Sequence, residues 1–141
     1  MIQQAKSSDL KIIVSLIKLN FDTFSEIESE EAGKYIRKLI SKRDKENNFF
    51  VSEISNRIVG CAGFSKQKDT SGVYCLNWLA VHPDFKRKGI ATELYHFIEE
   101  RIKKLAGRLI MLEAGSGEAN QYFYIKMGFV ECGRIPAYQS Y

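Results

Sequence analysis

The sequence has only two prolines, three cysteines and one tryptophan in 141 residues, and it contains no low-complexity tract or internal repeat. The low proline content and the absence of a biased tract argue against a disordered or fibrous protein. No apolar run approaches the roughly 18 residues of a membrane-spanning helix, so no membrane association is predicted. The length and the 45% hydrophobic content instead predict one domain over residues 1–141.

The cysteines, Cys61, Cys75 and Cys132, are odd in number, far apart and set among apolar residues. This pattern favours buried thiols in a reducing cytoplasm over a disulfide framework. Because there are also only two histidines, no metal site is predicted. The net charge of +4 is small for a nucleic-acid binder, although the basic run at 86–88 leaves a basic interaction module as an alternative.

Hydrophobic periodicity gives the order of the elements. It predicts a strand at 2–5, helices at 9–21 and 29–41, and a hairpin of strands at 49–54 and 57–66 that turns at Ser55-Asn56. The segment at 73–81 is apolar on both faces, so it is predicted to be the longest strand and central in the sheet. A helix from Gly89 to about 105, a strand at 108–113, a helix at 117–127 and a last strand at 129–135 follow.

This order, β-α-α-β-β-β-α-β-α-β, predicts an α/β fold. The expected core is a mixed, mostly antiparallel sheet flanked by about four helices.

Lys86, Arg87 and Lys88 stand immediately before Gly89, where the amphipathic helix begins. A helix N-terminus presents unpaired backbone N–H groups and attracts anions, and a glycine lets a phosphate approach them. The pattern therefore indicates a diphosphate site, with a plain tight turn bearing solvated cations as the alternative. The spacing matches neither a P-loop nor a dinucleotide fingerprint.

Two segments, "LAVHPDFKRKGIATELYHFIEERIKK" and "RLIMLEAGSGEANQYFYIKMGF", resemble the core of the GNAT superfamily of acetyl-CoA-dependent N-acetyltransferases. The resemblance implies that acetyl-CoA lays its pyrophosphate on the glycine turn and its pantetheine beside the strand at 73–81. The cofactor-binding residues would be Leu79, Ala80, Val81, Lys86, Arg87, Lys88, Gly89, Ile90, Ala91, Thr92 and Asn120. The family pattern has Gln or Arg where this chain has Lys86, so the backbone amides are expected to dominate.

The same resemblance assigns the proton donor for the departing thiolate to Tyr124, with Tyr122 as the competitor if the helix register differs. Many relatives carry a glutamate at the position of Asn77, which cannot act as a base. Asn77 is instead expected to hold a water, and Glu113 becomes the candidate base. Glu26 and Glu28 in the connector between the first two helices are the alternatives.

The acceptor is expected to enter between that acidic connector, at 21–31, and the C-terminal segment at 134–141. Acidic residues suit a cationic amine, so a primary amine of a small molecule is the expected substrate. The alternatives are a protein N-terminus as acceptor and a noncatalytic acyl-CoA-binding sensor. Relatives close the sheet with one more strand, which is here either absent or supplied by a second copy in a homodimer.

Overall fold

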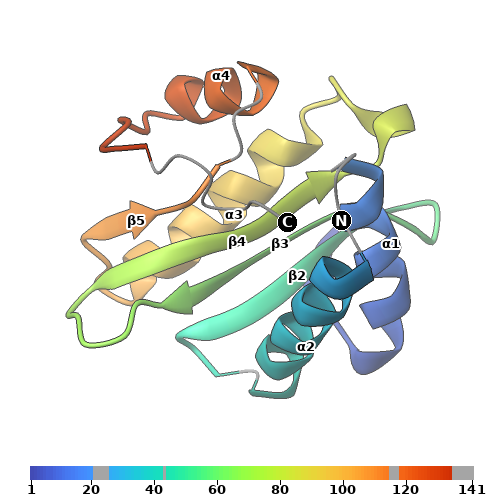
Figure 1. Cartoon of the computed structure of the whole chain (residues 1–141), viewed down its shortest axis with the longest axis horizontal. Helices are drawn as coiled ribbons and strands as arrows, with labels where there is room; N and C mark the ends of the chain where they lie inside the picture. Colours follow the sequence, from blue (N-terminus) through green and yellow to red (C-terminus); the bar gives the residue numbers. More distant parts are fainter. Residues whose placement is uncertain (21–25, 43, 115–117, 135–141) are drawn as a thin grey trace.

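Five strands and four α-helices form the part of the chain that the computed structural model describes, which is residues 1–20, 26–42, 44–114 and 118–134, with backbone alone at 26–28 and 118–120. The strands are β1 (Ile2–Gln4), β2 (Asn47–Ile54), β3 (Arg57–Lys66), β4 (Val73–Val81) and β5 (Leu109–Met111). The helices are α1 (Leu10–Asn20), α2 (Glu26–Lys42), α3 (Ile90–Lys104) and α4 (Glu118–Lys126). Figure 1 shows α1 and α2 on one face of the sheet and α3 on the other.

The strands lie in the sheet in chain order, from β1 to β5. The first four pair antiparallel and β5 pairs parallel to β4, which confirms the mixed, mostly antiparallel sheet. The hairpin between β2 and β3 is also confirmed. Ser55 and Asn56 both have left-handed backbone, with φ of 50° and 63°, the conformation that a two-residue hairpin turn needs.

Each face of the sheet buries its own apolar cluster because side chains alternate along a strand. Phe49 and Val51 of β2 point to the face that α1 and α2 cover, whereas Phe50 between them points to the face of α3. The first cluster includes Ile13, Ile17, Ile36, Leu39, Cys61 and Ala80. The second includes Phe64, Leu76, Val81, Ile90, Leu94 and Ile98, with Tyr124 and Phe129 packed against it. The glycine turn and α4 are therefore attached to the α3 side.

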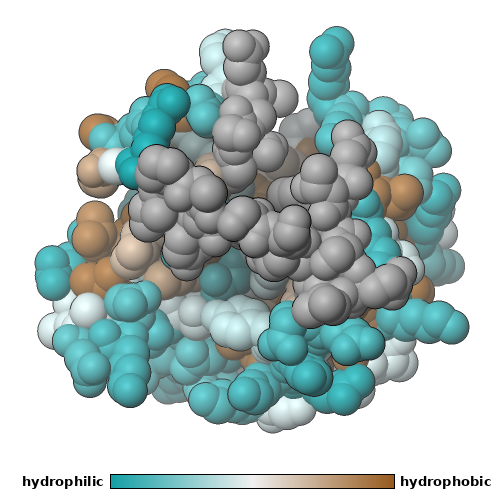
Figure 2. Space-filling view, viewed as in Figure 1, coloured by the Kyte–Doolittle hydropathy of each residue, from teal (hydrophilic) through white to brown (hydrophobic). Residues whose placement is uncertain are grey.

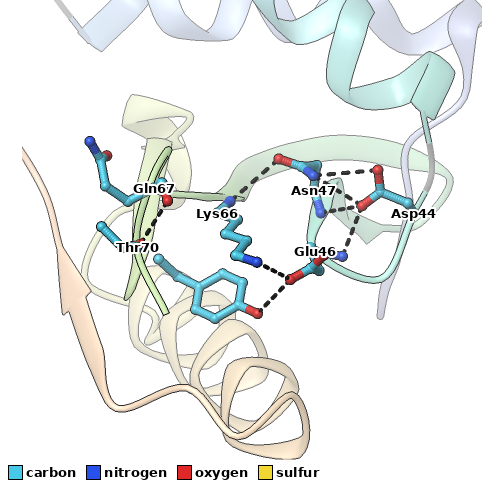
Figure 3. Close-up of polar contacts among 7 residues, drawn as sticks. Asp44, Glu46, Asn47, Lys66, Gln67 and Thr70 are labelled. Atoms are coloured by element: carbon cyan, nitrogen blue, oxygen red, sulfur yellow. Dashed lines mark hydrogen bonds and ion pairs between the residues drawn. The ribbon is translucent and has the colours of Figure 1, made fainter. Parts of the chain in front are cut away.

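The link from α2 to β2 is held by a polar cluster, drawn in Figure 3. Asp44 Oδ1 accepts hydrogen bonds from the backbone N–H groups of Glu46, at 2.8 Å, and of Asn47, at 2.7 Å. Glu46 Oε2 lies 3.2 Å from Lys66 Nζ and accepts a hydrogen bond from the Tyr74 hydroxyl at 3.3 Å. These contacts join the start of β2 to the end of β3 and to β4.

The predicted last strand at 129–135 is wrong for the residues that are described, since 129–134 form no strand. The Phe129 N–H donates instead to the Tyr124 carbonyl at 3.0 Å, and its ring turns inward against Tyr95. The described residues after α4 therefore do not extend the sheet beyond β5. Leu109 and Met111 of β5 are 51% and 40% exposed, and Figure 2 shows apolar surface on this side of the molecule.

Five further expectations need correction. The longest strand is β3, with 10 residues against 9 in β4, and β4 lies next to the edge strand rather than at the centre. Helix α2 begins at Glu26, three residues before the predicted start, and β5 is shorter than predicted. Of the three cysteines only Cys61 is fully buried, while Cys75 is half-buried and Cys132 exposed, because Cys132 lies in the segment that is not a strand.

Within the described ranges, no helix combines the length and the apolar character that a bilayer crossing requires.

Gly63 of β3, which lies opposite Asn77 of β4, tests the packing of this face. A Cβ there would meet the Phe49 ring and lie 2.9 Å from the Asn48 carbonyl oxygen. We expect Gly63→Ala to lower the free energy of unfolding by about 1–3 kcal/mol, measured by urea denaturation.

The same substitution at Gly33 in α2 is the matched control, since its Cβ would meet only Val14 Cγ2, at an ordinary 3.7 Å. Gly33→Ala should raise the stability by up to about 1 kcal/mol, because alanine favours a helix over glycine. Equal effects of the two substitutions would contradict the packing described here.

Candidate active site

Strand β4 is interrupted by a bulge at Trp78, whose backbone is left-handed with a φ of 51°. On β3, Gly63 lies opposite Asn77 and Cys61 lies opposite Ala80. Two residues of β4, Trp78 and Leu79, therefore fill the space opposite a single residue of β3, which defines a β-bulge. A bulge bends its strand, and here the bend comes where β4 should continue beside β5.

The pairing of β4 with β5 ends just before the bulge. It runs from Val73 opposite Leu109 to Cys75 opposite Met111. Beyond this point no strand in the described part of the chain pairs with the outer edge of β4 at Leu79–Val81. An exposed strand edge accepts an extended guest through its peptide groups. The three predicted residues of the pantetheine site, Leu79, Ala80 and Val81, lie on this edge.

The predicted glycine turn lies directly after β4. A short 3-10 helix (Pro83–Phe85) follows the strand, and Gly89 is the N-cap of α3 with a φ of 79°. Arg87 is also left-handed, with a φ of 62°, which costs a non-glycine residue about 1 kcal/mol. The first N–H to donate an intrahelical hydrogen bond is that of Glu93, to the Gly89 carbonyl. The backbone N–H groups of Ile90, Ala91 and Thr92 therefore have no partner within the helix.

The turn is open and basic, as an anion site requires. No atom lies within 4 Å of the position that a Cβ on Gly89 would take. Lys86, Arg87 and Lys88 are all exposed. The Lys88 ammonium lies 5.2 Å from the centre of the Phe85 ring, which keeps this cation beside the turn. Free amides, space and positive charge fit a diphosphate group.

Tyr124 projects from the last turn of α4, as predicted. Its ring is 5.7 Å from that of Phe129 and 5.3 Å from that of Phe123. Burial raises its pKa to about 12, so the phenol stays protonated throughout the physiological range. The ring packs against the same apolar cluster as Leu79 of the β4 edge. The competing Tyr122 is 70% exposed, which is a poor position for a proton donor in a closed site.

Asn77 and Glu113 lie on the other side of the β4 edge from Tyr124. Continuing the parallel register of Cys75 and Met111 by two residues places Glu113 opposite Asn77, where the strands have separated. Burial raises the pKa of the Cys75 thiol, and the Glu113 carboxylate raises it further. Glu113 is therefore near the α2 side of β4, although the two strands no longer pair there.

Other predicted site residues lie outside the described parts. They are the connector at 21–25, the C-terminal segment at 135–141, and the side chains of Glu26, Glu28 and Asn120. Sequence reasoning missed Ser65 on β3, which accepts a hydrogen bond from Asn77, and Tyr35 on α2, which is bonded to Ser65. Neither belongs to a motif, so only the folded chain brings them together.

Among the described residues, no group of His, Cys, Asp and Glu has the geometry to hold a metal ion.

A strand edge opened by a bulge, followed by a glycine turn at a helix N-terminus, has the shape and charge to take an extended carrier that contains a diphosphate. Residues 13–129 match the acetyltransferase (GNAT) family. The chain belongs to this family.

A search for relatives finds S-(2-succino)cysteine N-acetyltransferase of Bacillus subtilis (strain 168), 29% identical over 102 residues, or 67% of this chain. The match spans 62% of that relative's length. A GNAT-family protein from Desulfovibrio desulfuricans superposes with a TM-score of 0.83 at 18% identity, covering 99% of this chain and 90% of its own. The aminoglycoside acetyltransferase AAC(6')-Iy, bound to a CoA bisubstrate analogue, gives 0.74 at 19% identity, covering 100% and 97%. These structures share the fold.

Gly89→Glu tests the glycine turn. A carboxylate at this position would occupy the space above the amides and repel phosphate, so we expect affinity for CoA to fall at least about a hundredfold, measured by calorimetry. Gly128→Glu is the control, because Gly128 also has a positive φ, of 100°, and no atom within 4 Å of its would-be Cβ. That variant should bind CoA normally. Unchanged affinity in Gly89→Glu would contradict the assignment of the turn.

Proposed function

We propose that this protein transfers the acetyl group of acetyl-CoA to a primary amine of a small molecule, which attacks directly while both substrates are bound. The observation that carries the proposal is the bulge at Trp78, which separates β4 from β5 just before the glycine turn. Membership of the acetyltransferase family supports the same chemistry.

The cofactor residues divide into two groups that follow each other along the chain. The amides from Arg87 to Thr92 hold the pyrophosphate, with the cationic side chains of 86–88 around it. The edge of β4 at Leu79–Val81 offers peptide groups to the pantetheine, apart from the Val81 carbonyl, which accepts a hydrogen bond from Asn20 Nδ2 at 3.0 Å. Acetyl-CoA supplies the activated thioester, and a backbone N–H of this edge is the group that polarises a carbonyl placed there.

Tyr124 is the proton donor. A phenol with its pKa raised by burial to about 12 keeps its proton at all pH values at which the protein works. Because the pKa is raised, Tyr124 keeps its proton over a wider pH range and loses it only as the pH rises through about 12. A thiolate is a much weaker base than such a phenolate, so Tyr124 stabilises the leaving group as a hydrogen-bond donor and transfers its proton late.

The acceptor must lose a proton on the opposite side. An amine with a pKa near 10.4 is neutral in only about one molecule in 2,500 at pH 7, so its deprotonation has to be assisted. Asn77 cannot take a proton, whereas Glu113, opposite it in the continued register, carries a carboxylate. We assign the base to Glu113, acting directly or through a water.

The names of two relatives support a small acceptor. One is an N-acetyltransferase of an S-substituted cysteine, and the other was solved with an analogue that joins CoA to acetylneamine. Both acceptors are amines of small, polar molecules. The cytoplasmic location and the homodimer stay predictions from the sequence.

The test is an acetylation assay with mass detection on five amines: S-(2-succino)cysteine, cysteine, glucosamine 6-phosphate, neamine and spermidine. The proposal expects one of them to be acetylated with release of CoA in equal amount. Acetylation of peptide N-termini alone would replace the small acceptor by a protein. Tight binding of acetyl-CoA with no acetylated product from any amine or peptide would make the protein an acyl-CoA sensor and overturn the proposal.

Tyr124→Phe should lower kcat by about 100-fold or more while the Kd for acetyl-CoA changes less than about twofold, because only the proton donor is removed. In the wild type, kcat should not decline between pH 7 and 10, since Tyr124 remains protonated there. Tyr122→Phe is the matched control, and its exposed hydroxyl should be dispensable. Equal kcat in Tyr124→Phe and the wild type would remove the acid role.

Glu113→Gln should lower kcat/KM for the amine at pH 7 by about 10- to 100-fold, because an amide cannot accept the proton. Without the base only the neutral amine reacts, so log kcat/KM should rise by about one for each pH unit below the pKa of the amine. Glu100→Gln, on the exposed face of α3, is the control. A pH profile identical to that of the wild type would place the base elsewhere.

A further inference from the structure

Asn77 takes part in a chain of hydrogen bonds that spans three elements on the α2 side of the sheet. Its Nδ2 donates to Ser65 Oγ of β3 at 2.9 Å. Ser65 Oγ in turn lies 2.9 Å from the hydroxyl oxygen of Tyr35 on α2. Ser65 pairs with Cys75, so it is the diagonal neighbour of Asn77 across the two strands. Gly63, directly opposite Asn77, has no side chain that could come between Asn77 and Ser65.

The structure places the Nδ2 end of the Asn77 amide toward Ser65, and the planar amide then turns Oδ1 the other way. In the described ranges no residue donates a hydrogen bond to this oxygen. Asn77 is only half-buried and stands next to the bulge, so Oδ1 is an oriented acceptor at the place where β4 and β5 separate.

An oriented amide oxygen selects a ligand that donates. It accepts N–H from an amine in either protonation state and removes no proton from it. The continued strand register brings the Glu113 carboxylate to the opposite side of the same opening, where it favours a cation. A primary amine has enough N–H groups to bond to the Asn77 oxygen while another of its protons leaves.

We propose that Asn77 Oδ1 binds the acceptor amine and that Ser65 and Tyr35 are positioning residues that hold the amide in this orientation. The inference rests on the proposed function and extends it, since it separates orientation of the amine, by Asn77, from its deprotonation, by Glu113. Tyr35 is 38% exposed and comes from α2, whose first residues, 26–31, include most of the acidic residues of the predicted acceptor entrance. Helix α2 thereby sets the orientation of the group that receives the acceptor.

The test measures the KM of the amine and the Kd of acetyl-CoA in four variants, with the best acceptor of the five amines as the probe. Ser65→Ala and Tyr35→Phe should each raise the amine KM by about threefold to tenfold, the effect of one lost hydrogen bond. The Kd of acetyl-CoA should stay within about twofold. Ser65→Thr, which keeps the hydroxyl, should restore the wild-type KM, and Ser41→Ala at the exposed end of α2 should leave it unchanged.

A double-mutant cycle separates positioning from general packing. If Tyr35 acts through Asn77, Tyr35→Phe should raise the amine KM in the wild type and have no further effect in Asn77→Ala. Additive effects, an unchanged KM in both single variants, or an equal loss of acetyl-CoA affinity would overturn the proposal. If the wild type acetylates no amine, the proposed function fails and the amine site at Asn77 fails with it. If the wild type is active and the variants match it, only the inference fails.

Discussion

The left-handed backbone of Trp78 is the constraint on which the site depends. A tryptophan in this conformation costs about 1–2 kcal/mol, and the surrounding β3–β4 pairing has to maintain it. The bulge that results separates β4 from β5 after Cys75, so a strand inside the sheet acquires an edge. Without the bulge the parallel register would continue past Cys75 and close the place where a thioester can lie.

The two faces of the sheet give this opening two different sides. On one side α3 packs against the sheet, so the glycine turn at its start lies at the end of β4, and Tyr124 of α4 packs on the same cluster. On the other side α2 reaches the sheet through Tyr35 and Ser65 to Asn77. In the proposed mechanism the acetyl donor lies on the α3 side and the acceptor amine on the α2 side, so the two meet at the opening, as direct transfer needs.

The elements that the sequence predicted well are those with strong local signals. The bounds of β4, the turn at Ser55-Asn56 and the start of α3 after Gly89 agree with the structure, because apolar composition, turn residues and a glycine mark them. The last strand was mispredicted because its alternating pattern is local, whereas the chain direction there is set by the end of α4, through Phe129. The basic run before Gly89 indicated the turn, the resemblance to the family pointed to Tyr124, and the comparisons confirmed the family.

Other features depend on contacts between distant residues and left no signal. Nothing in the sequence marks Trp78 as left-handed, since that backbone follows from the register between β3 and β4. Asn77 bonds to Ser65, 12 residues earlier in the chain, and Ser65 bonds in turn to Tyr35 of α2. Neither type of residue is unusual at its position. In the sequence, Asn77 indicates only that the glutamate of many relatives is replaced by a residue that cannot act as a base. Its hydrogen bond to Ser65 is what supports a role in binding the acceptor.

The most direct test of this account is a crystal structure of the protein with CoA. We expect an extended pantetheine beside Leu79–Val81, its pyrophosphate on the amides that begin α3, and a left-handed Trp78 with β4 and β5 still separated after Cys75. Density for CoA at any other place, or a β5 that pairs with β4 up to Val81, would contradict the account.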